Sequence, residues 1–243
     1  MTATEKIAAL LKKPHYDFQD LIDIVEILRS DVGCPWDREQ NHQSIRKGLI
    51  EETYEVVEAI DNADPTLLRE ELGDLLLQIV FHSQLEREEK RFEMGDVVND
   101  ICVKMIHRHP HVFGSVQVSD STEVLSNWEA IKTEEKHRDT LVDKLRAIPP
   151  MMPALMRASK VGKKAGIAND TPPSEIIDQM IRELTALKTD LDAPDLDAET
   201  AVGAVLMRST ELSRALSVEA EYALTRQTEA IIEQVAQKSA KKD

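Results

Sequence analysis

The sequence is poor in the residues that cross-link a fold or interrupt its helices. Its 243 residues include two cysteines, eight glycines and ten prolines, and only 4% are aromatic. Two cysteines, Cys34 and Cys102, indicate no disulfide framework. Long helical patterns with few turn residues between them favour an all-α protein. Because no apolar run approaches 18 residues and the N-terminus lacks a signal-peptide pattern, we expect a cytoplasmic protein without a membrane span.

Positive charge is also scarce. The chain has 30 lysines and arginines against 45 acidic residues, which gives a formal net charge of −15. Such a chain lacks the broad basic face that binds nucleic acid, so we expect no direct nucleic-acid binding. If the protein handles an anion, it must do so locally, through metal ions or a few basic side chains.

Carboxylates concentrate on two expected helices, residues 44–61 and 66–90. They are Glu51, Glu52, Glu55, Glu71 and Asp74, with fifteen residues between the two halves of the set. Residues three or four apart share a helix face, so Glu52 lies beside Glu55, and Glu71 beside Asp74. Turn residues at 62–65 predict that the two helices are antiparallel neighbours. Four carboxylates would then converge across one helix pair.

The second of these helices is apolar almost all round from Leu72 to Phe81, which predicts a buried helix and at least a homodimer to cover it. Its polar residues form one stripe at helical spacing: Glu71, Asp74, Gln78 and His82. Clustered carboxylates repel, so they protonate, splay apart or bind a cation. All-oxygen ligands select hard ions, which predicts Mg²⁺, with Mn²⁺ as a substitute. The alternative is an ordinary solvated acidic surface.

Two further groups are candidates for ligand contacts. Trp36, followed by Asp37 in a predicted loop, either plugs the core or offers a platform on which a flat ligand stacks. Lys104 and Arg108 share one face of an expected helix that ends at Arg108; they either pair with surface acids or clamp phosphate. Histidines at alternate positions around Pro110 do not follow a zinc-ligand pattern.

The chain also contains a weak internal repeat. Residues 72–76 align with residues 202–206, which places Ala201 opposite Glu71 and Ala204 opposite Asp74. After a one-residue gap, Glu52 and Glu55 align with Glu183 and Ala186. If the match is not a chance similarity of amphipathic helices, the second copy keeps the helical frame and loses three of four carboxylates. We therefore expect a catalytic domain at 1–140, a proline-containing linker at 141–153 and an inactive helical domain at 154–243.

The acidic pattern resembles the signature of the MazG-like nucleoside triphosphate pyrophosphohydrolases. Further blocks similar to two-domain MazG proteins are Gly33–Asp37, Leu49–Val56, Glu71–Leu76, His109–Phe113, Trp128–Lys132 and Pro153–Arg157. The resemblance covers nearly the whole chain. It departs at the second domain, where the expected carboxylate set is reduced to Glu183.

This resemblance implies an all-α fold whose four-helix core is completed by dimerisation, or a higher homo-oligomer. It also implies Mg²⁺-dependent hydrolysis of NTPs or dNTPs at the α–β bond, giving a nucleoside monophosphate and pyrophosphate, as in house-cleaning of nucleotide pools. The family's metal ligands map onto Glu52, Glu55, Glu71 and Asp74. Its basic phosphate contacts map onto Lys104 and Arg108.

The expected roles leave some alternatives open. Glu51 is a candidate to orient or deprotonate the attacking water, although any of the five carboxylates could do so. Trp36 and Asp37 are candidates for contact with the base. A narrower dUTP or dCTP pyrophosphatase and a non-catalytic nucleotide-binding scaffold remain alternatives. A di-iron bundle is disfavoured, because Glu55 and Glu71 lack a histidine three residues on.

Overall fold

The computed structural model describes residues 2–135, 140–191, 193 and 196–240. Within these ranges the chain forms helices and no strand, which confirms the all-α prediction. The backbone divides into two compact units, Met1–Leu125 and Ser126–Asp243. The division lies before the linker expected at 141–153. Among the described helices, none combines the length and the hydrophobicity needed to cross a bilayer.

The first unit contains seven complete helices and the start of an eighth within its described residues. They are α1 (Ala3–Leu10), α2 (Phe18–Leu28), α3 (Pro35–Glu39), α4 (His42–Asp61), α5 (Pro65–Glu88), α6 (Met94–Arg108), α7 (Pro110–Phe113) and the start of α8 (Ser121–Glu135). The residues of α3 were expected to be a loop.

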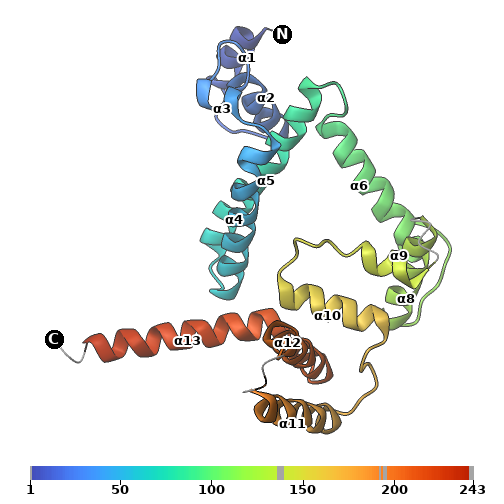
Figure 1. Ribbon diagram of the computed structural model, residues 1–243. Coiled ribbons are helices and arrows are strands. Elements are labelled where there is room, and N and C mark those ends of the chain that lie inside the picture. The colour runs from blue at the N-terminus through green and yellow to red at the C-terminus, as the bar shows by residue number, and fades with distance from the viewer. Residues whose placement is uncertain (1, 136–139, 192, 194–195, 241–243) are drawn as a thin grey trace. The chain divides into compact units, whose positions relative to one another are not determined.

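Helices α4 and α5 form an antiparallel pair, as expected from the turn between them (Figure 1). Asn41 begins α4 with a capping box, in which its side chain accepts from the backbone of Gln43 and Ser44. Asp64 caps α5 and Pro65 occupies its first turn. These local signals fix where the two helices start, and hence the register of their carboxylates.

The core of the first unit lies where α2 and the start of α4 meet the C-terminal half of α5. Its buried members are Val25, Ile45, Val80, Phe81, Leu85 and Met94. Within the single chain the 72–81 segment is only partly buried, with Leu72 48% exposed and Ile79 39% exposed, and the homodimer expected to cover it remains a prediction. Neighbouring helices therefore cover α5 mainly at its C-terminal half.

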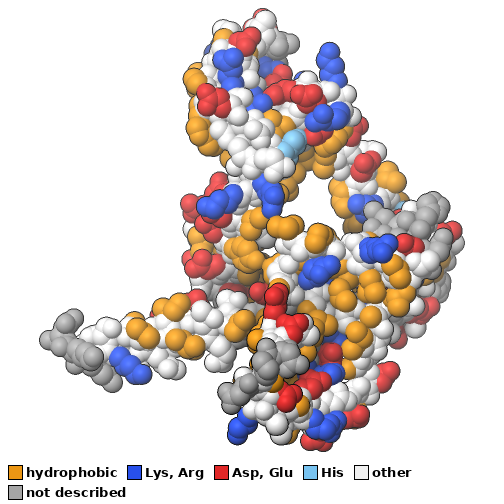
Figure 2. Space-filling model, in the orientation of Figure 1, with side chains coloured by type: hydrophobic (Ala, Val, Ile, Leu, Met, Phe, Trp, Pro, Cys, Tyr) orange, Lys and Arg blue, Asp and Glu red, His pale blue; other side chains and the backbone are white. Residues whose placement is uncertain are grey.

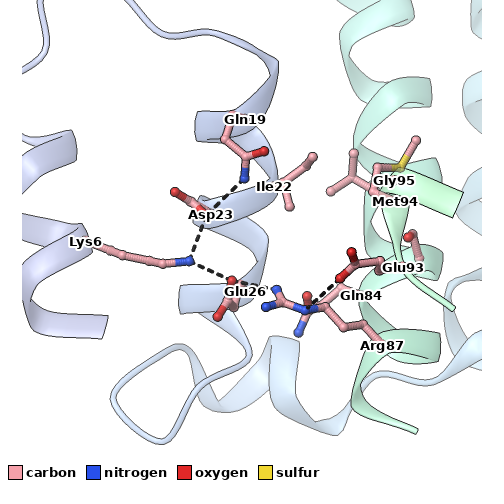
Figure 3. Close-up of a pocket in the computed structure, with 12 residues that line it drawn as sticks. Lys6, Gln19, Ile22, Asp23, Glu26, Gln84, Arg87, Glu93, Met94 and Gly95 are labelled. Carbon is pink, nitrogen blue, oxygen red and sulfur yellow. Dashed lines mark hydrogen bonds and ion pairs between the residues drawn. The ribbon is translucent and has the colours of Figure 1, made fainter. Parts of the chain in front are cut away.

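An ion-pair network joins α1, α2, α5 and the residue before α6 around a cavity of about 240 Å³ (Figure 3). The Lys6 ammonium lies 2.8 Å from carboxylate oxygens of both Asp23 and Glu26. Arg87 lies 2.7 Å from Glu26 and 3.7 Å from Glu93. The charges that line this cavity are thus paired with one another, and these ion pairs link the helices around it.

The helices of the second unit pack in the same pattern as those of the first unit. The described helices of this unit are the remainder of α8, then α9 (Leu141–Arg146), α10 (Ala154–Ala165), α11 (Pro173–Asp190), α12 (Ala198–Ala215) and α13 (Ala220–Ala240). Helix α12 packs on α10, α11 and α13, as α5 packs on α2, α4 and α6. Helix α9 occupies part of the expected linker and contacts α10. Figure 2 shows apolar side chains in the open along α13, where Ile231 is 60% exposed.

Candidate active site on an acidic helix pair

Three of the predicted metal ligands come together on the α4–α5 pair. Glu52 and Glu55 project from α4 and Glu71 from α5, and each offers an oxygen within 4.8 Å of the others. We call these three residues the acidic group. In the described part of the chain, no other set of three or more histidine, cysteine or acidic residues converges in this way.

Asp74 lies one helical turn after Glu71 and is exposed. It is outside the set of oxygens that lie within 4.8 Å of one another. Its charge nevertheless acts on that set, because it contributes to raising the pKa of both Glu52 and Glu71. As a fourth ligand, Asp74 remains a prediction.

The acidic group is electrostatically unfavourable on its own. Burial raises the pKa of Glu52 above its ordinary value, and the charges of Glu55 and Asp74 raise it further. The pKa of Glu71 is likewise raised, first by burial and then by Glu55. A hard cation would relieve this repulsion, and carboxylate oxygens are the ligands that such cations prefer. The donor set therefore fits Mg²⁺ or Mn²⁺.

Glu51 faces a different partner. Its carboxylate lies 2.7 Å from the Lys47 ammonium, four residues earlier on α4, and its side chain is 53% exposed. In this structure Glu51 is thus held by a surface ion pair outside the acidic group. Its role toward a water molecule remains a prediction.

Lys104 and Arg108 lie on α6, which meets α5 at the end away from Glu71. The start of α6 belongs to the core that includes Leu85, through Met94. Lys104 is half-buried and Arg108 is only 6% exposed. Lys104 and Arg108 are therefore joined to the helix pair of the acidic group through the start of α6, which packs against the C-terminal half of α5.

Trp36 lies in the short helix α3 and is 63% exposed, so the hypothesis that it plugs the core is wrong. Asp37 follows it, half-buried, and its backbone carbonyl accepts a hydrogen bond from the Arg29 guanidinium. This contact ties α3 to α2. Because the indole is exposed, a flat ligand could stack on it, and this role of Trp36 remains a prediction.

Comparison with known proteins assigns the fold and site to a family. Residues 40–113, which carry the acidic group, match the MazG nucleotide pyrophosphohydrolase domain. Over 218 residues the chain is 40% identical to the nucleoside triphosphate pyrophosphohydrolase/pyrophosphatase MazG of Thermotoga maritima, covering 89% of this chain and 83% of that protein. The chain belongs to the MazG family.

Two other relatives agree with this assignment. The nucleoside triphosphate pyrophosphohydrolase of Escherichia coli K12 is 40% identical over 217 residues, which is 86% of this chain and 82% of that protein. That of Mycolicibacterium smegmatis is 30% identical over 231 residues, 94% of this chain and 67% of that protein. The similarity to MazG proteins therefore extends through both units.

In this MazG chain, a pair of histidines forms a further polar contact between α4 and α5, away from the acidic group. His42 opens α4, and its Nδ1 lies 2.7 Å from Nδ1 of His82 on α5. Its Nε2 lies 2.6 Å from Glu86. The helical stripe at 71–82 predicted a polar position for His82, whereas sequence reasoning missed His42 as its partner. Only the antiparallel register of the two helices could have revealed it.

Proposed function

We propose that this chain hydrolyses nucleoside triphosphates at the α–β bond, giving a nucleoside monophosphate and pyrophosphate. The observation that carries the proposal is the acidic group, which lies within the matched MazG domain. The names of the relatives from T. maritima and E. coli support the same activity. House-cleaning of NTP and dNTP pools is the role that we propose for it.

The acidic group, with Asp74, is proposed to hold Mg²⁺, for which Mn²⁺ can substitute. When bound, such an ion neutralises part of the triphosphate charge and lowers the pKa of a water molecule. The protein's own contribution is the fixed placement of carboxylates on two rigid helices. Burial raises the pKa of Glu52 and Glu71, and the neighbouring carboxylates raise it further; a bound cation would relieve that repulsion.

The other predicted residues take roles around this centre. Glu51 would leave its ion pair with Lys47 to orient or deprotonate the attacking water. Lys104 and Arg108 would donate hydrogen bonds to phosphate oxygens, where charge develops in the transition state. The exposed Trp36 would stack on the base. Asp37 beside it would contact the base edge.

We also propose that the working form is a homodimer or a higher homo-oligomer. The single chain leaves large apolar side chains exposed on α4, α5 and α6, including Tyr54 at 56%, Leu72 at 48% and Ile106 at 52%. Large apolar side chains exposed in contiguous patches mark interaction sites, and we propose that these residues form such a patch when two chains meet. Packing two α4–α5 pairs together would complete a four-helix core and cover these residues.

A screen of the eight common NTPs and dNTPs together with dUTP, all with Mg²⁺, tests the proposal directly. We expect pyrophosphate and a nucleoside monophosphate as the products, with EDTA abolishing turnover. Orthophosphate as the product would indicate cleavage of another bond and contradict the proposal. Turnover of dUTP or dCTP alone would assign the narrower activity. Tight nucleotide binding without any turnover would assign the scaffold function instead.

A further inference from the structure

In the second unit, the one carboxylate that the repeat alignment retains is held by an arginine. Arg208 on α12 donates from Nη2 to Oε1 of Glu183 on α11, at 2.7 Å. Its Nη1 donates to Glu211, one turn later on α12, whose side chain is 6% exposed. The guanidinium thus bridges the two helices and is itself 24% exposed. Because both partners are anionic, this is a charge-assisted contact.

The alignment gives Arg208 a defined counterpart. At the offset that pairs Asp74 with Ala204, Arg208 corresponds to Gln78 of α5. Side chains on a helix lean toward its N-terminus, so a residue covers the turn that precedes it. For Arg208 that turn carries Ala204, where the first unit has a carboxylate. A cation on α12, one turn after Ala204, is thus bound to Glu183, the one acid that the second helix pair retains.

The charges of the two helix pairs are balanced in different ways. In the first unit, burial raises the pKa of Glu52 and Glu71 and repulsion between the carboxylates raises it further; a cation from solution would relieve that repulsion. In the second unit, contact with Glu183 and Glu211 raises the pKa of Arg208 instead. Here the chain supplies its own positive charge.

We infer that Arg208 takes the place of the divalent cation in the α11–α12 pair. The comparison with the α4–α5 pair rests on the metal site proposed above, whereas the contact between Arg208 and Glu183 does not. Two consequences follow. The α11–α12 pair is held together without a metal ion, and the guanidinium opposes the entry of one even where carboxylates are restored.

Two full-length variants separate this inference from a simple lack of ligands. One restores the acids with Ala186→Glu, Ala201→Glu and Ala204→Asp and keeps Arg208. The other carries the same three changes together with Arg208→Gln, the residue at the aligned position of α5. Binding of Mn²⁺ alone is counted from the electron paramagnetic resonance signal of the free ion, with the unmodified chain as the reference.

We expect the variant with Arg208→Gln to bind additional Mn²⁺ at least tenfold more tightly than the variant that keeps the arginine. Equal affinity in the two variants, whether both gain a site or neither does, would overturn the inference. The outcome is independent of the proposed function. If the unmodified chain bound no Mn²⁺ at all, the metal site of the first unit would be refuted, while the comparison of the two variants would still stand.

Single substitutions decide the matter if the combined variants do not fold. Arg208→Gln should lower the thermal midpoint of the full chain, and it should lower it less when Glu183→Gln is already present, because the bridge is then already lost. Arg182→Gln removes the same charge from the exposed neighbour of Glu183 and should leave the midpoint unchanged. An unchanged midpoint for Arg208→Gln, or equal losses with and without Glu183, would overturn the inference.

Discussion

The Nδ1 atoms of His42 and His82 lie 2.7 Å apart, and their ring planes differ by 4°. Two rings stacked face to face would lie roughly 3.5 Å apart, the distance of ordinary van der Waals contact. The 2.7 Å between the Nδ1 atoms is shorter than that, so these nearly parallel rings meet edge to edge. Glu86 accepts from Nε2 of His42. One hydrogen therefore lies between the two Nδ1 atoms, and the arrangement holds while the pair carries no charge or one positive charge.

A second positive charge on the pair should break this contact. Burial lowers the pKa of His82, and the charge of His42 lowers it further. A histidine whose folded pKa lies below its unfolded value contributes stability that is present above about pH 6.5. That contribution is lost as the pH falls through the folded pKa. We expect the thermal midpoint to fall between pH 7.5 and pH 5.5, and to fall less for His82→Gln.

The neighbouring acid titrates in a different window. Hydrogen bonds from Arg91 and His42 lower the pKa of Glu86 to about 2, so its contribution is lost only below about pH 4.5. It cannot account for a change above pH 5.5. His15→Gln alters an exposed histidine and serves as the matched control. Equal pH dependence in the unmodified chain and His82→Gln would contradict the assignment to His82.

Removal of one carboxylate should abolish turnover without unfolding the protein. Asp74→Ala takes an exposed acid from a helix interior, where alanine is favourable, so helical circular dichroism should be unchanged. Loss of a metal contact should lower kcat/KM by more than about 100-fold, since even residues that only support a metal ligand contribute about 10- to 100-fold. Near-native turnover with Mg²⁺ would remove Asp74 from the site.

The same full-length Asp74→Ala protein also tests the second unit. Ala186, Ala201 and Ala204 supply no carboxylate there, and Glu183 is engaged with Arg208. We expect no residual NTP hydrolysis above background at any Mg²⁺ concentration. Residual activity that disappears on further substitution in α11 or α12 would show a working second site and refute the one-site hypothesis.

Glu55→Gln should stabilise the metal-free protein while it impairs catalysis. The charge of Glu55 helps to raise the pKa of both Glu52 and Glu71, and a raised carboxylate pKa marks a cost that is present when the group is ionised. With EDTA at pH 8, the thermal midpoint should rise above that of the unmodified chain; near pH 3, where these carboxylates are protonated, the gain should vanish. Glu58→Gln, one turn along α4, is the control and should show no comparable gain.

Arg108→Ala should weaken transition-state stabilisation by about 2–4 kcal/mol, comparable to the loss of a preorganised donor. That corresponds to about a 30- to 1000-fold fall in kcat/KM. Arg108→Lys should restore it only in part, because the planar fork is lost. Since Arg108 is 6% exposed, thermal denaturation must show that each variant remains folded. Unchanged kcat/KM in both Arg108→Ala and Lys104→Ala would leave this pair without a role in catalysis.

Sedimentation tests the proposed assembly. Burial of exposed apolar residues on α4, α5 and α6 should give at least a dimer at micromolar concentration, whereas a stable 27.4 kDa monomer would contradict it. Leu72→Lys places a charge on an apolar side chain that is 48% exposed and should weaken association. Val218→Lys changes a comparably exposed residue, at 45%, in the turn before α13, and should leave association unchanged.

The sequence by itself determined the features that depend on short separations along the chain. Spacing of three residues places Glu52 and Glu55 on one face of a helix, because the helical period is a property of the backbone. Asn41 and Asp64 begin α4 and α5 through hydrogen bonds to their own neighbours. With both starts known, the convergence of Glu71 on the first two carboxylates follows from the sequence alone.

Only the tertiary structure decided the contacts between residues far apart in sequence. His42 meets His82 across forty positions, and Arg208 meets Glu183 across twenty-five. Helical periodicity gives the face of each residue but not which atoms of two facing side chains come within hydrogen-bonding distance. Trp36 shows the same limit, since its pattern allowed a buried or an open indole. Which one forms depends on how many neighbouring helices cover it, and that is a property of the packed chain.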